Sequence, residues 1–166
     1  AWLPPVEWLG AERAARWPLH LVTCQPADRL HSQLDPAPAT RAHKVAGREA
    51  VLLHPDDAAE RGIAQGDVVR LFNDRGACLG GAQLSADLLR GVVVMPTGAW
   101  FDPQDDTLER HGNPNVLTVD VGTSRLAQGP SALSALVQVE RWHGEAPAVR
   151  AFEPPPLRAE TPGAPR

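Results

Sequence analysis

The chain has 166 residues, of which 43% are hydrophobic and 22% are charged, and it carries a formal net charge of −4 at pH 7. These values fit one ordinary globular domain with a single core. They argue against a dedicated nucleic-acid-binding protein, which would present a basic face. The longest apolar run is a handful of residues, so the sequence predicts no membrane span and no secretory signal. Because the chain begins with Ala1 instead of Met, we expect a processed or excised part of a longer protein.

The first 17 residues contain three tryptophans but no regular apolar pattern. A short helix over residues 6–16 is the best candidate element, and we interpret residues 1–17 as an arm or linker that lies across a neighbouring surface. The first strand is predicted over residues 18–24. The Pro- and Ala-rich run from Asp35 to Ala39 is predicted to be a loop, because prolines interrupt regular elements.

A short helix and a β-hairpin are predicted in the middle of the chain. Pro55 fits the first position of a helix within residues 54–62, and Gly62 fits its left-handed end. Residues 73–76 tolerate positive φ, which predicts a hairpin turn. The return strand contains Gly80-Gly81, where we expect a β-bulge. After the first strand, the predicted strands cover residues 49–53, 68–72, 77–84, 92–95 and 133–142.

Short strands, one or two short helices and Gly/Pro turns predict a small, mainly β barrel over residues 18–142. Residues 143–166 are rich in proline and lack apolar periodicity. We therefore predict a disordered tail, or an extended segment that orders only on a partner. Cys24 and Cys78 could form a disulfide. We favour the interpretation that both are small, buried hydrophobic residues, because no Cys-x-x-Cys spacing points to redox or metal chemistry.

The most informative segment follows the first predicted strand and reads Gln25-Pro26-Ala27-Asp28-Arg29-Leu30-His31-Ser32-Gln33. Most of its side chains can make directed hydrogen bonds. Such a density of donors and acceptors suits a large polar ligand that carries phosphates or heterocyclic nitrogens. Arg29 could face a phosphate or brace the loop against a carboxylate. Ser32 and Gln33 can both donate to and accept from the edge of a ring.

Three later segments are also rich in glycine and polar side chains: Gly98-Ala99-Trp100-Phe101-Asp102-Pro103, His111-Gly112-Asn113-Pro114-Asn115-Val116-Leu117-Thr118, and Gly122-Thr123-Ser124-Arg125-Leu126-Ala127-Gln128-Gly129. Together with the polar loop, and in this order, they resemble the C-terminal, dinucleotide-binding domain of the dimethyl sulfoxide reductase family of molybdoenzymes. The resemblance is strongest to the biotin sulfoxide and trimethylamine N-oxide reductases of that family. It spans roughly residues 18–142 and implies a six-stranded double-psi β-barrel.

The resemblance implies that the chain binds molybdopterin guanine dinucleotide with molybdenum. The matching residues implied to contact this cofactor are Gln25, Arg29, His31, Ser32, Gln33, Asn113, Asn115 and Gln128. Family members usually carry His at the position of Gln25, so that contact differs here. Without the resemblance, Asn113-Pro114 reads as a turn and Gln128 as part of a capping turn. His111 is either functional or the start of the turn at Asn113-Pro114. Trp100 either packs against the cofactor or walls the funnel that leads to it, and a core or interface role is the alternative.

The enzyme implied by the resemblance is an oxidoreductase that reduces S-oxides or N-oxides by oxygen-atom transfer, chemistry that belongs to the cofactor. The resemblance does not cover the catalytic machinery. We therefore expect no catalytic residue and no metal ligand in this chain, with both on upstream domains or on another subunit. A cytoplasmic location is expected, because relatives of the biotin sulfoxide type are cytoplasmic, and a periplasmic location is the alternative.

A second interpretation is a stand-alone binding or interaction module on the same barrel, without molybdenum, because one fold can serve many functions. The presence of both the Arg29-Leu30-His31-Ser32-Gln33 run and the Asn113-Pro114-Asn115 run argues against it. A hydrolase is disfavoured because the chain has no Gly-x-Ser-x-Gly elbow. A zinc site is disfavoured because the histidines are dispersed, with no His-x-x-x-His pair.

Overall fold

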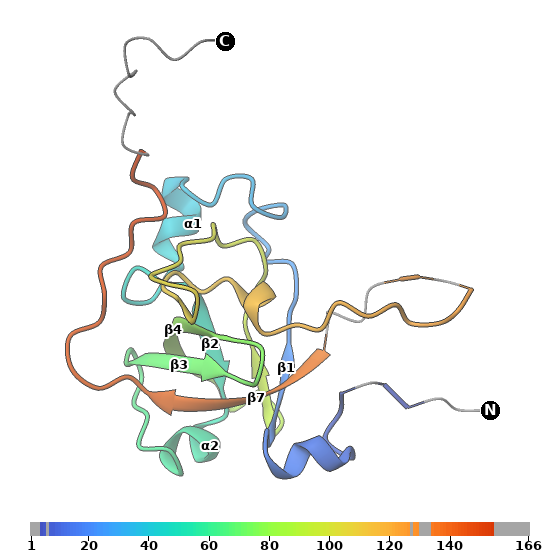
Figure 1. Ribbon diagram of the computed structural model, residues 1–166. Helices are drawn as coiled ribbons and strands as arrows, with labels where there is room; N and C mark the ends of the chain where they lie inside the picture. The colour runs from blue at the N-terminus through green and yellow to red at the C-terminus, as the bar shows by residue number, and fades with distance from the viewer. Residues whose placement is uncertain (1–3, 6, 127, 130–133, 155–166) are drawn as a thin grey trace.

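The computed structural model describes residues 4–5, 7–126, 128–129 and 134–154. Its centre is a closed barrel of six short strands with short helices around it (Figure 1). The strands of the ring are β1 Leu19–Val22, β2 Ala50–Leu53, β3 Val68–Phe72, β4 Ala77–Leu84, β5 Val92–Val94 and β7 Ser134–Arg141. They pair in the order β2-β5-β1-β7-β3-β4, and the pairing of β4 with β2 closes the ring. Each strand of the ring thus has two partners, which confirms the predicted six-stranded, mainly β barrel.

The pairing directions decide where the loops meet. The pairs β1–β5 and β2–β4 are parallel, and the other pairs within the ring are antiparallel. A short strand, β6 Leu108–Glu109, adds to β4 outside the ring. Because β1 and β5 run in the same direction, the loops that follow them leave from the same edge of the barrel. A 2.9 Å hydrogen bond from the Thr97 N–H to the Cys24 carbonyl keeps these two loops side by side beyond the strands.

The barrel interior is filled by alternate side chains of the strands. In β3, Val69 and Leu71 are fully buried, whereas Val68, Arg70 and Phe72 are partly exposed. The same inward set includes Leu19, Leu21, Val51, Leu53, Val93, Met95, Ala135, Val137 and Val139. Burying each of the larger aliphatic side chains stabilises the fold by roughly 1.5–3 kcal/mol. In β3 the alternation of buried and partly exposed side chains thus selects the residues of the core.

Among the described residues, four short helical segments lie around the barrel. The α-helices are α1 Pro38–Ala42 and α2 Pro55–Ala59, and the 3-10 helices are η1 Glu12–Ala15 and η2 Pro114–Val116. The predicted short helix around residues 54–62 is confirmed as α2, with Pro55 at its first position. The His54 ring accepts a hydrogen bond from the Asp56 N–H, and Gly62 has a φ of +63°. The His54 ring thus pairs with a free N–H group at the start of α2, and Gly62 adopts the left-handed conformation expected after its end.

Three local predictions outside the N-terminal arm are wrong. Pro38 and Ala39 belong to α1 and not to a loop, because a proline at the first helical position needs no N–H partner. No bulge interrupts the pairing of β3 with β4 at Gly80-Gly81. These glycines permit close packing instead, because a Cβ at Gly80 would lie 2.3 Å from Val51 Cγ2. The prediction that both cysteines are buried is confirmed for Cys78 and wrong for Cys24, which is exposed. Both cysteines are free.

The N-terminal arm lies against the barrel. It contains a single helical turn, η1, in place of the longer helix predicted over residues 6–16, and Val6 lies outside the described residues. The buried carboxylate of Glu7 accepts hydrogen bonds from two Arg75 nitrogens at 2.6 and 3.0 Å and from the Leu136 N–H at 2.6 Å. These contacts tie the arm to β7 and to the β3–β4 hairpin.

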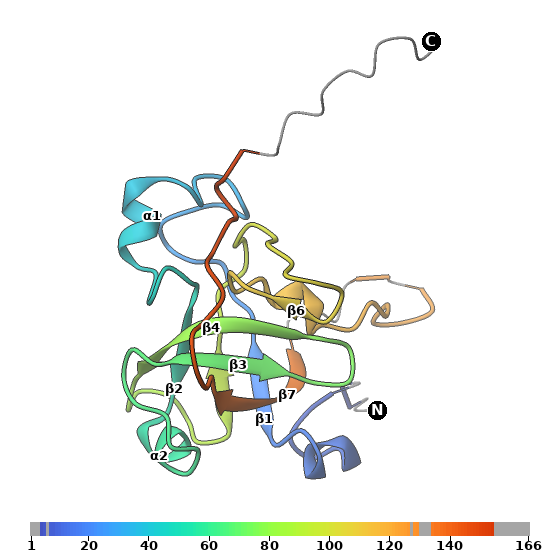
Figure 2. The same ribbon diagram turned by 60° about the vertical axis from the view of Figure 1, so that its left-hand side comes forward.

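The segment after β7 runs from that strand past β3 and β4 toward α1 (Figure 2). Within the described residues 143–154, Arg48 donates to the Pro147 carbonyl and the Arg150 N–H donates to Asp102. This part of the predicted tail therefore contacts the barrel. Residues 155–166 lie outside the described residues.

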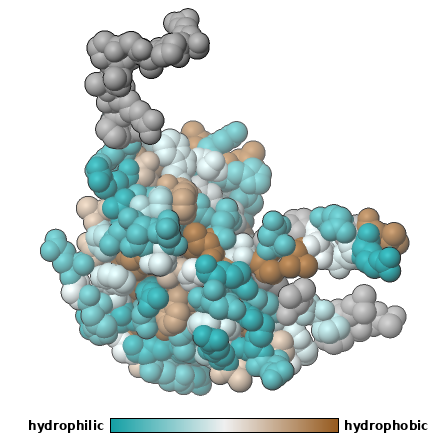
Figure 3. Space-filling model, in the orientation of Figure 1, coloured by the Kyte–Doolittle hydropathy of each residue, from teal (hydrophilic) through white to brown (hydrophobic). Residues whose placement is uncertain are grey.

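A loop that includes residues 119–126 projects from the barrel, and its Leu126 is almost fully exposed (Figure 1). The face seen in Figure 3 is mainly hydrophilic, with apolar side chains in separate patches. None of the helices within the described residues has the length and apolar character needed to cross a membrane.

Candidate functional site

A cleft of about 730 Å³ opens at the edge of the barrel where the loops after β1, β5 and β6 meet. This volume lies within the roughly 300–1,000 Å³ typical of cofactor and small-molecule sites. Residues after β1 that line it are Thr23, Cys24, Gln25, His31 and Ser32. The other lining residues are Thr97, Gly98, Ala99, Trp100, Phe101, Asn113, Asn115 and Ala151. The cleft thus draws on three of the four segments singled out in the sequence.

Five of the eight predicted contact residues line this cleft, namely Gln25, His31, Ser32, Asn113 and Asn115. Arg29, Gln33 and Gln128 do not. Gln33 is exposed on the same loop. Gln128 donates a 2.7 Å hydrogen bond to the Ser124 carbonyl within its own projecting loop, which is the turn-forming role left open for it.

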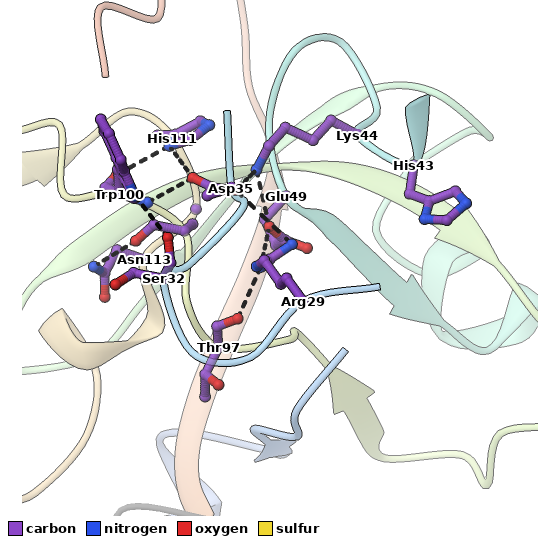
Figure 4. A network of polar contacts seen from close by, with 12 residues as sticks. Arg29, Ser32, Asp35, His43, Lys44, Glu49, Thr97, Trp100, His111 and Asn113 are labelled. Carbon is purple, nitrogen blue, oxygen red and sulfur yellow. Dashed lines mark hydrogen bonds and ion pairs between the residues drawn. The ribbon is translucent and has the colours of Figure 1, made fainter. Parts of the chain in front are cut away.

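Arg29 braces the polar loop from beneath. Its guanidinium donates 2.8 Å hydrogen bonds to the Glu49 carboxylate and to the Thr97 carbonyl. Lys44 joins the same buried group, with its Nζ 2.8 Å from Asp35 Oδ1 and 3.1 Å from Glu49 Oε2. Figure 4 shows these four charged side chains pointing toward one another under the loop. Of the two roles left open for Arg29, the geometry supports the brace.

The two loops after β1 and β5 touch backbone to backbone at His31 and Gly98. His31 has a φ of +50° and Gly98 a φ of +96°. A Cβ added at Gly98 would lie 1.9 Å from the His31 carbonyl oxygen. Glycine is therefore required here for both its positive φ and its small size. This contact fixes how the His31-Ser32 pair faces the cleft.

Trp100 and Phe101 form an aromatic wall of the cleft and are 41% and 60% exposed. The Trp100 N–H donates to Asp35 at 2.8 Å, and its indole N–H donates to the Ser32 carbonyl at 2.8 Å. His111 Nδ1 lies 2.9 Å from the Trp100 carbonyl, so this nitrogen carries the proton and donates.

The His111 ring is fully buried behind this wall. Burial lowers the pKa of His111, and the nearby charge of Lys44 lowers it further, against the opposing effects of the Trp100 carbonyl and Asp35. The ring is therefore neutral at pH 7. Its Nε2 has no hydrogen-bond partner among the described residues.

Glu109 shapes the loop that carries the two asparagines. Its buried carboxylate accepts four backbone N–H bonds, from Asp102, His111, Gly112 and Asn113, at 2.7–3.1 Å. Burial raises the pKa of Glu109, although these N–H groups partly offset the effect. A carboxylate with this many donors acts as a template for the loop.

The two asparagines have different roles in this loop. The Asn113 side chain accepts from the Asn115 N–H at 3.0 Å and donates to the Ala99 carbonyl at 2.9 Å. Asn113 therefore connects its loop to the aromatic wall while lining the cleft. Asn115 is exposed at the cleft, where its amide can face a ligand.

Sequence reasoning missed several residues of the site. Thr23, Cys24 and Thr97 line the cleft but belong to no recognisable motif. Glu109 and Asp35 organise the loops around the cleft through contacts with distant residues. The density of polar residues after β1 and β5 was the only signal available for this group.

Comparison with known proteins identifies the family of the chain. Residues 19–136 match the family model described as "Molydopterin dinucleotide binding domain". Because the match covers well over half of the chain, the protein belongs to the molybdopterin dinucleotide-binding domain family. The resemblance inferred from the sequence is therefore confirmed.

The chain is 52% identical over 155 residues to the biotin sulfoxide reductase of Cereibacter sphaeroides, covering 92% of this chain and 21% of that protein. It is 43% identical over 158 residues to the dimethyl sulfoxide/trimethylamine N-oxide reductase of Rhodobacter capsulatus, covering 93% of this chain and 19% of that protein. The chain thus spans about a fifth of the length of these relatives.

Among solved structures, acetylene hydratase from Pelobacter acetylenicus matches with a TM-score of 0.68 and 16% identity. The match covers 86% of this chain and 21% of that protein. At this identity the likeness shows the fold alone.

Proposed function

We propose that this chain is the domain of a molybdenum oxidoreductase that holds molybdopterin guanine dinucleotide in the cleft between the loops after β1, β5 and β6. The observation that carries the proposal is the cleft itself, which gathers Ser32, Asn113, Asn115 and the aromatic wall in a member of this domain family.

The donor set of the cleft fits a pterin dinucleotide. Asn115 offers an amide that donates and accepts side by side, which matches the alternating edge of a pterin or guanine ring. Ser32 and Thr97 add hydroxyl groups that can donate or accept. Trp100 and Phe101 supply apolar area beside these polar groups. The combination of a few placed polar groups with aromatic surface is typical of cofactor sites.

When bound, the molybdenum of this cofactor supplies oxygen-atom transfer, and the protein supplies binding and orientation. In the part of the chain that the structure describes, no group of three or more His, Cys, Asp or Glu side chains could hold a metal ion. We propose that the metal's protein ligand and the substrate pocket lie on the remainder of a longer enzyme. The role of this chain is to cover the cofactor and exclude water.

Exposed apolar side chains around the cleft support such a covering role. Leu30 and Leu34, which flank the cleft-lining residues His31 and Ser32 in sequence, are 58% and 62% exposed, and Trp100 and Phe101 of the aromatic wall are exposed as well. An apolar rim of this kind usually marks a contact surface. We propose that the remainder of the enzyme packs on this rim. The named activities of the relatives support an S-oxide or N-oxide as the substrate. We propose a cytoplasmic location only from the family resemblance of the sequence.

The experiment that tests the proposal measures released, oxidised pterin by fluorescence after denaturing the enzyme in its complete native form. We expect pterin in the wild-type enzyme and a reduced content in Asn115→Ala. The matched control is Gln83→Ala, which removes an exposed amide in β4 outside the cleft. Wild-type protein without pterin would favour a stand-alone interaction module. Full pterin content in Asn115→Ala would remove this residue from the site.

A further inference from the structure

Trp100 is partly exposed at the cleft, and hydrogen bonds hold both its backbone and its side chain in place. Its indole lines the cleft and the residue is 41% exposed. Its backbone N–H and carbonyl are nevertheless bonded to the fully buried side chains of Asp35 and His111. Its indole N–H is bonded to the Ser32 carbonyl. Holding an exposed aromatic residue at three polar points costs conformational entropy, so its fixed orientation calls for an explanation.

The segment of residues 145–153, here called the C-terminal strap, also contacts Trp100. It is held to the barrel at two points, by Arg48 on the Pro147 carbonyl and by the Arg150 N–H on Asp102 at 2.6 Å. Between the second point and the end of the strap, Ala151 lines the cleft. The strap therefore forms part of the site, although it follows the last strand of the barrel.

Phe152 is the contact between the strap and the aromatic wall. Its ring centroid lies 5.6 Å from that of Trp100 at an interplanar angle of 67°. It also meets the His111 ring edge to face, with centroids 5.0 Å apart and an angle of 89°. Both geometries are favourable for aromatic pairs. One ring thus supports both the indole and the histidine that holds the Trp100 carbonyl.

We infer that Phe152 is a positioning residue, which holds the Trp100 indole at the cleft so that the indole packs on a flat ring of the bound ligand. The inference rests on the proposed function, because it assigns the ring to the pterin dinucleotide. It adds a second residue of the C-terminal strap, after Ala151, to a site built mainly from the barrel loops. Phe152 acts through Trp100, whereas the polar residues of the cleft face the ligand directly.

The test uses the complete native enzyme and follows the rate of pterin release in mild denaturant by fluorescence. Phe152→Ala and Trp100→Ala should each release pterin roughly three- to tenfold faster, the effect of losing one favourable aromatic contact. If Phe152 acts through Trp100, the double variant should release pterin no faster than Trp100→Ala alone. A purely structural role of Phe152 would instead give effects that multiply.

A second readout is hydrogen exchange of the backbone amides of residues 98–102. Exchange should be faster in Phe152→Ala and unchanged in Phe152→Tyr, which keeps the ring. The matched control is Glu153→Ala, because its carboxylate pairs with Arg150 at the surface. Unchanged release and exchange in Phe152→Ala, or multiplying effects in the double variant, would overturn the inference alone. Wild-type enzyme without pterin would overturn the proposed function and the inference together.

Discussion

The Arg29 guanidinium lies 2.8 Å from the Glu49 carboxylate, in a position that leaves only 2% and 7% of the two side chains exposed. In the loop of residues 25–33, Arg29 thus pairs with Glu49 on the side of the barrel, whereas His31 and Ser32 line the cleft. The same Arg29 nitrogen also donates to the Thr97 carbonyl, and Arg29 is not among the residues that line the cleft. The charge of Arg29 therefore shapes the site without facing it.

The first prediction concerns this pair. Arg29→Met should lower the free energy of unfolding by about 3 kcal/mol, because it leaves the buried Glu49 carboxylate with fewer partners. Chemical denaturation measures the change. Arg141→Met is the control, because Arg141 pairs with Asp67 at the surface and its loss should cost at most about 1 kcal/mol. Equal effects of the two substitutions would show that the buried pair has no special role.

The second prediction concerns the contact between Gly98 and the His31 carbonyl. Gly98→Ala should lower the free energy of unfolding by about 3 kcal/mol, because it combines a positive φ with a Cβ placed 1.9 Å from an oxygen. Gly144→Ala separates these causes, since Gly144 has a φ of +81° with nothing within 4 Å of its added Cβ. We expect about 1 kcal/mol there. A similar cost at both positions in thermal unfolding would mean that the loops can separate easily.

The third prediction concerns Glu109 and the asparagine loop. Glu109→Gln replaces an acceptor of four N–H bonds with a group that has one acceptor oxygen and two hydrogens of its own. Leaving buried N–H groups unpaired should cost about 2 kcal/mol. We also expect a lower pterin content, because the same loop presents Asn115 to the cleft. Glu140→Gln, at an exposed position in β7, should leave both quantities near wild type.

The reach of sequence reasoning differs between the barrel and the site. The bounds of β3 and β4 follow from two short apolar runs and from the turn residues 73–76 between them, which are local signals. The C-terminal strap was not assigned to the site, because the partners of Phe152 are Trp100 and His111, far away in the chain. Glu109 could not be assigned to the site from the sequence either. It lies in a Leu-Glu-Arg run that matches no motif, and its role depends on the four backbone N–H groups that donate to it in the folded chain.

The two possible roles of Arg29 show why residue type alone could not settle the site. Arg, Ser and Gln in one loop are equally able to meet a ligand. Which of them does so depends on the two acids beside Arg29: Asp35 follows the loop in the chain, and Glu49 lies there because β2 starts at Ala50. The resemblance to a family pointed to this loop, and three of its residues line the cleft. Geometry then separated the side chains that face the cleft from the one that supports it.

The fourth prediction follows from the buried His111 ring, whose pKa is lowered mainly by burial. In the unfolded chain the ring titrates near the ordinary value of 6.5. Below that pH the unfolded state binds a proton that the folded state resists, so the free energy of unfolding should fall as the pH drops from about 6.5. Above pH 6.5 the His111 contribution is fully present.

His111→Asn should remove this part of the pH dependence, because an amide can still donate to the Trp100 carbonyl but does not titrate. The measurement is the difference in the free energy of unfolding between wild type and variant from pH 8 to pH 5. Comparing the two proteins at each pH cancels the opposite contribution of Glu109, whose raised pKa favours the folded state in acid. If the difference in the free energy of unfolding stays constant across this range, the folded protein accommodates a charged His111, and its burial does not lower the pKa.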